Sequence, residues 1–253
     1  GSGKTPLAIK IFKELEKKEN CIVIKKNYSN QIDEINLLRD KVKLLTPSSR
    51  IEGIIEAEKS GITTAIFDDG LQDFSFKKDI SILCINSLNG FGNERILPAG
   101  PLRESLSSIK NVELAVINGP KNIEIEKEIF KRNKSIKIYY SKYVMKNFEK
   151  YLGKDIFAFS GIANNNQFFD HLNKIKLNVK KTKSFPDHYN YSDEDLNKIL
   201  YICEQESFLP LTTEKDYFRL NNFFKNKINY IPVELEIDNY SGFIHDLENI
   251  KNI

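Results

Sequence analysis

The sequence predicts a doubly wound α/β fold with a mostly parallel sheet, followed by a second, smaller α/β domain. Three observations support this prediction: a motif of glycine, lysine and threonine at the start of a helical pattern, a pair of aspartates at the end of an apolar run, and the alternation of short apolar runs with helical patterns. The chain has 253 residues, 40% of them hydrophobic, which suits one large domain or two small ones.

The composition excludes several classes of protein. The 38 basic and 35 acidic residues nearly cancel, so we expect no nucleic-acid partner. No apolar run approaches the roughly 20 residues that a membrane-spanning helix needs, so the chain as given reads as soluble. Cys21, Cys84 and Cys203 stand far apart in the sequence, which argues against a disulfide framework and against paired metal ligands.

The chain opens with the hexapeptide Gly1-Ser-Gly-Lys-Thr-Pro6, which matches the second half of the phosphate-binding loop G-x-x-x-x-G-K-[ST]. In such loops the backbone amides approach phosphate oxygens, the lysine carries positive charge to the β- and γ-phosphates, and the threonine hydroxyl binds Mg²⁺. On this motif alone a flexible glycine turn remains an alternative. The predicted nucleotide-binding residues are Gly1, Ser2, Gly3, Lys4 and Thr5.

Two adjacent carboxylates follow the apolar run Thr63–Phe67. Asp68 and Asp69 precede a glycine, and an Asp-Gly turn is the plain interpretation. In P-loop enzymes, however, a buried strand beside the phosphate loop ends in an aspartate that holds the metal. Neighbouring carboxylates also repel each other unless a cation offsets their charge. Together the two motifs predict a P-loop NTPase-like sheet with its ligand site at the carboxyl ends of the strands.

The remaining strands are predicted from short apolar runs. In the first part of the chain these runs are Cys21–Ile24, Val42–Leu45, Thr64–Phe67, Ile80–Ile85, Leu114–Ile117 and Ile136–Tyr140. In the second part the strands are expected at Asp155–Ser160, in the lysine-rich stretch that ends at Phe185, at Phe208–Thr212 and at Tyr230–Ile237.

Helices are predicted where a capping residue precedes an apolar face. Ser48 or Ser49 caps a helix through Lys59, and Ser192 caps another whose first turn is acidic. The polar stretch 141–154 reads as a linker. We therefore predict a P-loop domain over residues 1–140 and a smaller α/β domain over residues 155–253 that ends in a helix.

A long loop gives the most specific signal. Residues 89–104 read Asn-Gly-Phe-Gly-Asn-Glu-Arg-Ile-Leu-Pro-Ala-Gly-Pro-Leu-Arg-Glu. With the opening hexapeptide and Asp68-Asp-Gly-Leu-Gln72, this loop resembles the tetraacyldisaccharide 4'-kinases of lipid A synthesis. The resemblance extends to about Asp216, through the later stretches Phe159-Ser-Gly-Ile-Ala-Asn164, Phe185-Pro-Asp-His188 and Thr213-Glu-Lys-Asp216.

The resemblance implies a function. Members of the family transfer the γ-phosphate of ATP, with Mg²⁺, to the 4'-hydroxyl of a tetraacylated glucosamine disaccharide 1-phosphate and so form lipid IVA. It also implies a peripheral enzyme at the cytoplasmic face of the Gram-negative inner membrane. In the family a membrane-docking segment precedes the phosphate loop, and we expect that contact to lie in a segment absent from this chain.

The resemblance also assigns roles to residues. It implies that Thr5, Asp69 and Glu104 converge on Mg²⁺. Asp68 and Arg103, beside these ligands, are the candidates to contact the substrate or its phosphate.

The resemblance implies a catalytic pair that acts together with Lys4. Asp33 lies in a weakened form of the motif G-D-E-P-x-L-L and is the candidate catalytic carboxylate, with His188 as its partner. From the residues alone, Asp33 is a solvated helix start and His188 a turn residue. The pair falls in different predicted domains, so we expect domain closure to join it.

The chain departs from the family pattern in places. Lys25-Lys26-Asn27-Tyr28 replaces a Ser-Arg-Gly-Tyr segment, which leaves Lys26 and Tyr28 as possible contacts to substrate phosphate. Asp73 stands where the family has histidine. Two alternatives therefore stay open: a P-loop kinase or NTPase that acts on a soluble small molecule, and a non-catalytic nucleotide-binding relic.

Overall fold

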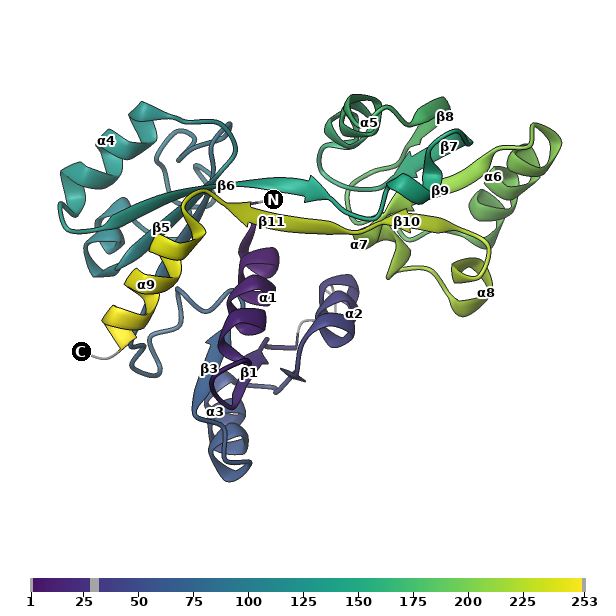
Figure 1. The fold of residues 1–253 in the computed structure, drawn as a ribbon. Helices are drawn as coiled ribbons and strands as arrows, with labels where there is room; N and C mark the ends of the chain where they lie inside the picture. Colours follow the sequence, from purple (N-terminus) through teal and green to yellow (C-terminus); the bar gives the residue numbers. More distant parts are fainter. Residues whose placement is uncertain (1, 28–31, 252–253) are drawn as a thin grey trace. The chain divides into compact units, whose positions relative to one another are not determined.

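The computed structural model describes residues 2–27 and 32–251 and separates the chain into two compact units (Figure 1). Unit 1 comprises Gly1–Asn27, Val42–Val144 and Leu235–Ile253, and unit 2 comprises Tyr28–Lys41 and Met145–Glu234. No helix in the described part of the chain is both long enough and apolar enough to cross a bilayer.

Unit 1 contains two sheets, and its strand pairs β1–β2, β1–β3, β4–β5 and β5–β6 are parallel. In the first sheet the order is β2-β1-β3, and in the second it is β11-β6-β5-β4. The strands are β1 (Cys21–Ile24), β2 (Leu44–Leu45), β3 (Thr64–Phe67), β4 (Ile82–Asn86), β5 (Leu114–Asn118), β6 (Lys137–Met145) and β11 (Val233–Ile237). Every residue of β1 and of β5 is buried, as expected for parallel strands covered on both faces.

The helices of unit 1 begin where the sequence offers a cap or a glycine. The α-helices are α1 (Lys4–Leu15), α3 (Arg50–Lys59), α4 (Ile123–Arg132) and α9 (Tyr240–Lys251), and a 3-10 helix covers Leu106–Asn111. Ser49 caps α3 by accepting a hydrogen bond from the Glu52 amide at 3.3 Å. Asn122 caps α4 in the same way. The predicted helix from Ser49 to Lys59 is therefore confirmed.

Unit 2 is built on one parallel sheet of order β10-β9-β7-β8. Its strands are β7 (Asp155–Ser160), β8 (Asn178–Ser184), β9 (Leu209–Thr213) and β10 (Asn229–Ile231). Its helices are α2 (Ile32–Lys41), α5 (Asn165–Lys174), α6 (Asp193–Gln205), α7 (Glu214–Tyr217) and α8 (Asn222–Lys225), with a 3-10 turn at Glu149–Tyr151. Ser192 caps α6, as predicted.

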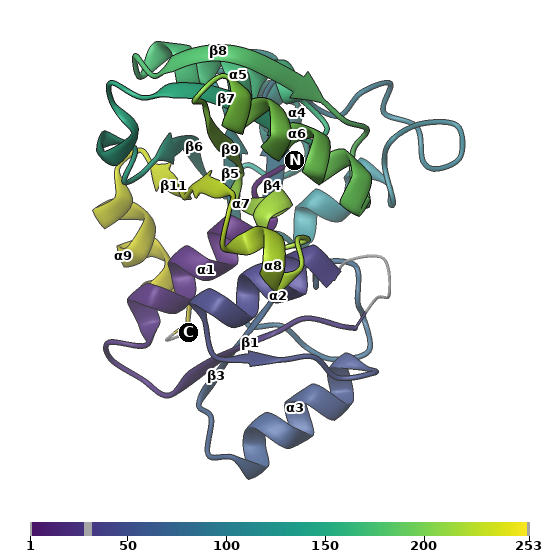
Figure 2. The same cartoon turned by 90° about the vertical axis from the view of Figure 1, so that its right-hand side faces the viewer.

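The side chains of β7 divide between two apolar clusters, because successive residues of a strand point to opposite faces. Ile156 and Ala158 pack with the α5 residue Leu172, whereas Phe157 and Phe159 pack with residues of α6. The two helices therefore cover opposite faces of the sheet, as Figure 2 also shows.

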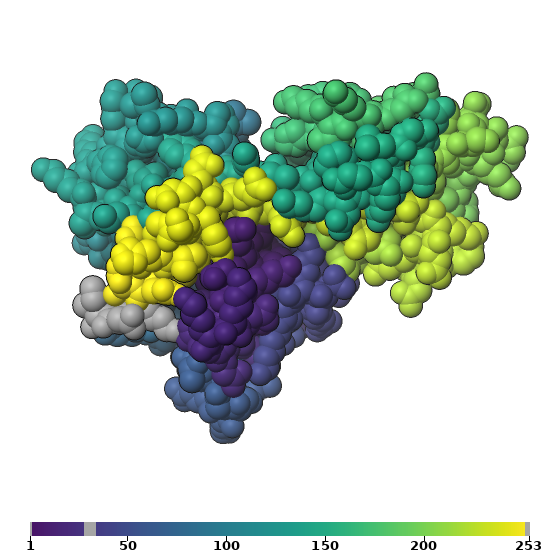
Figure 3. All heavy atoms as spheres, in the orientation of Figure 1, coloured from purple at the N-terminus to yellow at the C-terminus, as the bar shows by residue number. Residues whose placement is uncertain are grey.

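The structure divides the chain differently from the prediction. Strand β6 runs through Met145, into the stretch that was expected to be a linker. Helix α9 belongs to unit 1 and not to the second domain: the Phe243 ring lies edge-on to Tyr139, and Lys18 pairs with Glu248 at 2.6 Å. Figure 3 shows α9 in yellow against α1 in purple.

Pro232, which has no backbone donor, separates β10 from β11 where one strand was expected.

Candidate active site

The start of α1 lies beside the carboxyl ends of β1 and β3. Gly3 occupies the N-cap position of α1 with φ 90°, a left-handed conformation that glycine adopts without strain. No described side chain caps this helix, so its first amides are available to an anion. Ser2 is half-buried and Gly1 lies outside the described residues. The start of α1 therefore leaves room for the predicted phosphate contacts at Gly3, Lys4 and Thr5, which stay a prediction.

The Thr5 hydroxyl donates a hydrogen bond to Asp68 Oδ2 at 2.9 Å. The Lys25 ammonium donates to the same oxygen at 2.8 Å, and the side chains of Lys25 and Asp68 are 2% and 1% exposed. Asp68 Oδ1 is also buried and has no hydrogen-bond partner among the described residues. This buried group of Thr5, Lys25 and Asp68 forms the inner part of the site.

Asp69 forms the more exposed part of the site. Its carboxylate pairs with Lys4 at 2.7 Å and with Arg103 at 3.0 Å. Burial acts to raise the pKa of Asp69, but the hydrogen bonds and positive charges of Lys4 and Arg103 outweigh it and hold the pKa below its ordinary value. Asp69 has φ 62°, and its carbonyl accepts a hydrogen bond from Arg50 at 2.7 Å.

The expected metal trio of Thr5, Asp69 and Glu104 is not held together by direct contacts. Thr5 is bonded to Asp68, and Glu104 forms no hydrogen bond or ion pair within the described chain. No three His, Cys, Asp or Glu side chains of the described residues gather where they alone could hold a metal. Mg²⁺ in kinases usually takes only one or two carboxylates and completes its shell with phosphates and water. The unpartnered Asp68 oxygen and the neighbouring Thr5 hydroxyl fit such a metal.

His188 lies in unit 2, in a turn after β8. Its φ is 58°, and its amide donates to the Gly161 carbonyl at 3.1 Å. Lys215 Nζ lies 3.2 Å from Nε2 of the ring, and Arg219 Nη2 lies 3.3 Å from Nδ1. The lysine and arginine side chains carry only hydrogen-bond donors, and a neutral imidazole has only one acceptor nitrogen. Only one of the two side chains can therefore donate to the ring at a time.

Helix α2, which carries Asp33, lies in the same unit as His188. Glu34 is 3.9 Å from Lys215, and Lys41 pairs with Glu214 at 2.5 Å, so α2 packs against α7. The side chain of Asp33 lies outside the described part of the structure, as does Tyr28. The expected separation of Asp33 and His188 into different domains is not what the structure has, because α2 packs with unit 2.

A buried carboxylate organises the turn around His188. Asp216 is fully buried and accepts hydrogen bonds from the Gly161 amide at 3.0 Å, the Thr213 hydroxyl at 2.7 Å and Arg219 at 2.9 Å. It thereby fixes the guanidinium that contacts the His188 ring. Asp216 lies in the stretch Thr213-Glu-Lys-Asp216, to which the sequence alone assigns no role.

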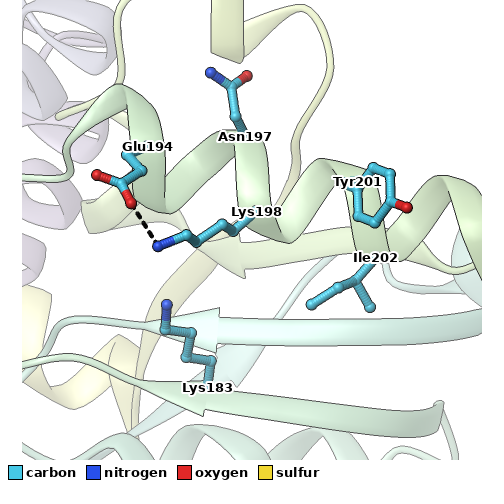
Figure 4. Close-up of a pocket in the computed structure, with 6 residues that line it drawn as sticks. All are labelled: Lys183, Glu194, Asn197, Lys198, Tyr201 and Ile202. Carbon is cyan, nitrogen blue, oxygen red and sulfur yellow. Dashed lines mark hydrogen bonds and ion pairs between the residues drawn. The ribbon is translucent and has the colours of Figure 1, made fainter.

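Sequence reasoning also missed Lys25. It proposed the neighbouring Lys26, which is half-buried, as a phosphate contact. The sequence carries no signal for Lys25, because only the register of β1 against β3 places it opposite Asp68. A shallow groove between β8 and α6 contains none of the predicted residues (Figure 4). It is lined by Lys183, Glu194, Asn197, Lys198, Tyr201 and Ile202.

Lys4 and Thr5, at the start of a helix, pair with two aspartates at the end of a parallel strand. This arrangement is typical of a nucleotide-binding α/β protein of the P-loop NTPase class. The model of the family Tetraacyldisaccharide-1-P 4'-kinase matches residues 1–251. The chain belongs to this family.

Individual relatives agree with this family. A tetraacyldisaccharide 4'-kinase from Pelagibacter ubique is 40% identical, over 98% of this chain and 80% of that protein. One from Bradyrhizobium diazoefficiens is 30% identical, over 94% of this chain and 77% of that protein. A crystal structure of the "apo" form of LpxK from Aquifex aeolicus, in complex with ATP, matches with a TM-score of 0.73 at 23% identity. The match covers 99% of this chain and 84% of the Aquifex chain, and at 23% identity it supports the fold alone.

Proposed function

We infer that this chain transfers the γ-phosphoryl group of ATP to the 4'-hydroxyl of a tetraacylated glucosamine disaccharide 1-phosphate. The observation that carries this inference is the family match over residues 1–251, in which Lys4 and Thr5 begin a helix beside Asp68 and Asp69. The ATP in the solved Aquifex protein supports ATP as the phosphate donor.

The donor side of the reaction belongs to unit 1. Lys4 and the first amides of α1 would neutralise the phosphate oxygens, and Arg103 adds a second positive charge beside Asp69. Thr5 and Asp68 would hold Mg²⁺, with Asp69 and Glu104 as further candidate ligands. A bound Mg²⁺ would offset phosphate charge during transfer.

The acceptor side belongs to unit 2. The 4'-hydroxyl must lose its proton as its oxygen bonds to the γ-phosphorus and ADP leaves. His188 would accept this proton, and Asp33 would orient the ring and offset the charge that it gains. The contacts of His188 with Lys215 and Arg219, and the packing of α2 against α7, support this assignment.

The acceptor also suggests where the enzyme acts. An acylated disaccharide resides in a membrane, and ATP is present on its cytoplasmic side. We therefore place the reaction at the cytoplasmic face of the inner membrane.

Product analysis with radiolabelled ATP tests the function. We expect label on the acylated disaccharide and none on nucleoside monophosphates or simple sugars. Phosphorylation of a soluble sugar or nucleotide instead would favour a different kinase. ATP binding without turnover of any acceptor would favour a non-catalytic relic.

The variant Lys4→Ala tests the phosphate cradle. Because Lys4 would stabilise charge on the transferring phosphoryl group, we expect kcat to fall by roughly 10²–10³-fold. Lys13→Ala, an exposed lysine in the last turn of the same helix, is the matched control and should keep wild-type turnover. Near-normal kcat in Lys4→Ala would show that the cradle lies elsewhere.

A further inference from the structure

Lys25 is a fully buried cation at the nucleotide site that the family match does not explain. It follows the last residue of β1 directly. The parallel register pairs Ile24 with Phe67, so the next residues, Lys25 and Asp68, lie opposite each other at the strand ends. The Lys25 amide donates to the Leu45 carbonyl at 3.0 Å, which fixes its backbone. A buried ammonium is costly unless it is paired, and Asp68 supplies the pairing charge.

The pairing leaves Asp68 incompletely used. Both Lys25 and Thr5 donate to Oδ2, while the buried Oδ1 has no hydrogen-bond partner in the described chain. A carboxylate has about four acceptor positions, and leaving a buried oxygen unpaired is unfavourable. The free oxygen therefore indicates a ligand that brings a cation or a donor, and Thr5 places this ligand at the phosphate loop.

We propose that Lys25 is a positioning residue that acts as the resident counter-charge of Asp68. It holds the carboxylate against Thr5 when no divalent cation is present, and it competes with that cation for the carboxylate. This proposal rests on the proposed use of a nucleotide but not on the identity of the acceptor.

Removal of Lys25 should have opposite effects on the affinity for metal-free ATP and on the affinity for a divalent cation. Without its ammonium, the Asp68 charge repels the phosphates of metal-free ATP, so that this form binds more weakly. The same uncompensated carboxylate attracts a divalent cation more strongly. A lysine with a merely structural role would weaken both interactions together or neither.

The experiment compares Lys25→Met with the wild-type chain by isothermal titration calorimetry. We expect the dissociation constant of ATP in EDTA to rise roughly tenfold, and the Mg²⁺ concentration at half-saturation with ATP to fall roughly tenfold. Lys43→Met, an exposed lysine before β2, is the control and should change neither quantity. Equal loss of both affinities, or no change in a folded variant, would overturn the proposal.

A second variant covers the outcome in which Lys25→Met does not fold. Lys25→Met/Asp68→Asn removes both charges and so keeps the net charge of the site. We expect it to bind metal-free ATP within about threefold of wild type and to need roughly tenfold more Mg²⁺, because the carboxylate is gone. Tenfold weaker binding of metal-free ATP in this variant would contradict the counter-charge role. If the wild type binds ATP but fails to phosphorylate the lipid, the proposed function fails while this inference stands.

Discussion

Asp73 stands where the resemblance to the family predicts a histidine. Its carboxylate pairs with Arg50 at 3.0 Å. Arg50 in turn donates to the carbonyl of Asp69, whose left-handed backbone directs the carboxylate toward Lys4. The substitution therefore links α3 to the strand end that carries Asp69.

The pKa of Asp73 makes this link testable. Hydrogen bonds from the Ser75 hydroxyl and amide, together with the Arg50 charge, outweigh the effect of burial and lower the pKa to about 2. A lowered pKa stabilises the fold above the unfolded value of about 3.9, and that contribution is lost as the pH falls toward 2. We expect Asp73→Asn to lower the free energy of unfolding by about 1–2 kcal/mol at pH 7, after allowance for partial exposure.

Urea denaturation from pH 7 to pH 2 measures this contribution. The difference between Asp73→Asn and wild type should shrink below about pH 4, where the carboxylate of the unfolded chain takes up a proton, and vanish near pH 2, where the folded carboxylate is also protonated. Asp79→Asn, at an exposed aspartate of the same loop, is the control. A difference that stays constant over this pH range would exclude the ionised pair as its source.

Single residues were predictable where a motif fixes their chemistry. Two local patterns predict Lys4, Thr5, Asp68 and Asp69. The structure pairs Lys4 with Asp69 and Thr5 with Asp68. Lys25 was not predictable, because a lysine after an apolar run is ordinarily exposed. Only the register of β1 against β3 buries it opposite Asp68.

Most elements were predictable because their sequences combine an apolar pattern with a cap. Strands β1, β3, β4 and β5 of unit 1 and the capped helices α3 and α6 are examples. The residues alone predicted a helix start at Asp33 but not the extent of α2, because its sequence has a weak apolar face and the helix is stabilised by packing against α7 in a different part of the chain. The end of β6 was misjudged because Ser141 and Lys142 interrupt its apolar run.

Gly53 provides a test of packing against propensity within α3. Alanine in a helix interior is favoured over glycine by about 0.5–1 kcal/mol. Here an added Cβ would lie 2.8 Å from Pro47 Cγ and 2.9 Å from Ile24 Cγ2. Overpacking of this kind typically costs about 1–3 kcal/mol, so we expect Gly53→Ala to destabilise the fold by about 1 kcal/mol in urea denaturation.

A double-mutant cycle identifies the cause. In a Pro47→Ala background one of the two close contacts is gone, so Gly53→Ala should cost less than in the wild-type chain. An equal cost in both backgrounds would point away from Pro47, and a stabilising Gly53→Ala would show that propensity outweighs packing.

The residues proposed for the two halves of the chemistry belong to different units of the molecule. The phosphate loop and both strand-end aspartates lie in unit 1, whereas α2 and His188 lie in unit 2. The sequence could not predict this division, because linear boundaries assume that a chain leaves a domain once. Here residues 28–41 and the return through β11 interrupt that order, and only tertiary contacts assign them.

This division predicts a separation of kinetic effects. If Asp33 and His188 act together in proton transfer, Asp33→Ala and His188→Ala should each lower kcat by roughly 10²–10⁴-fold. The double variant should lose little more than the worse single variant, because neither residue works without the other. The dissociation constant of ATP should stay within about twofold of wild type in all three variants, because the proposed nucleotide residues belong to unit 1.

Single-turnover kinetics and ATP calorimetry on the same preparations check both parts of this prediction. His171→Ala is the matched control, since His171 is a half-buried histidine of unit 2 that belongs to none of the motifs. Fully multiplicative losses in the double variant would mean that Asp33 and His188 act independently. Wild-type turnover in either single variant would remove that residue from the mechanism. A tenfold loss of ATP affinity in His188→Ala would show that the histidine serves the nucleotide, and the assignment of donor and acceptor chemistry to separate units would then be wrong.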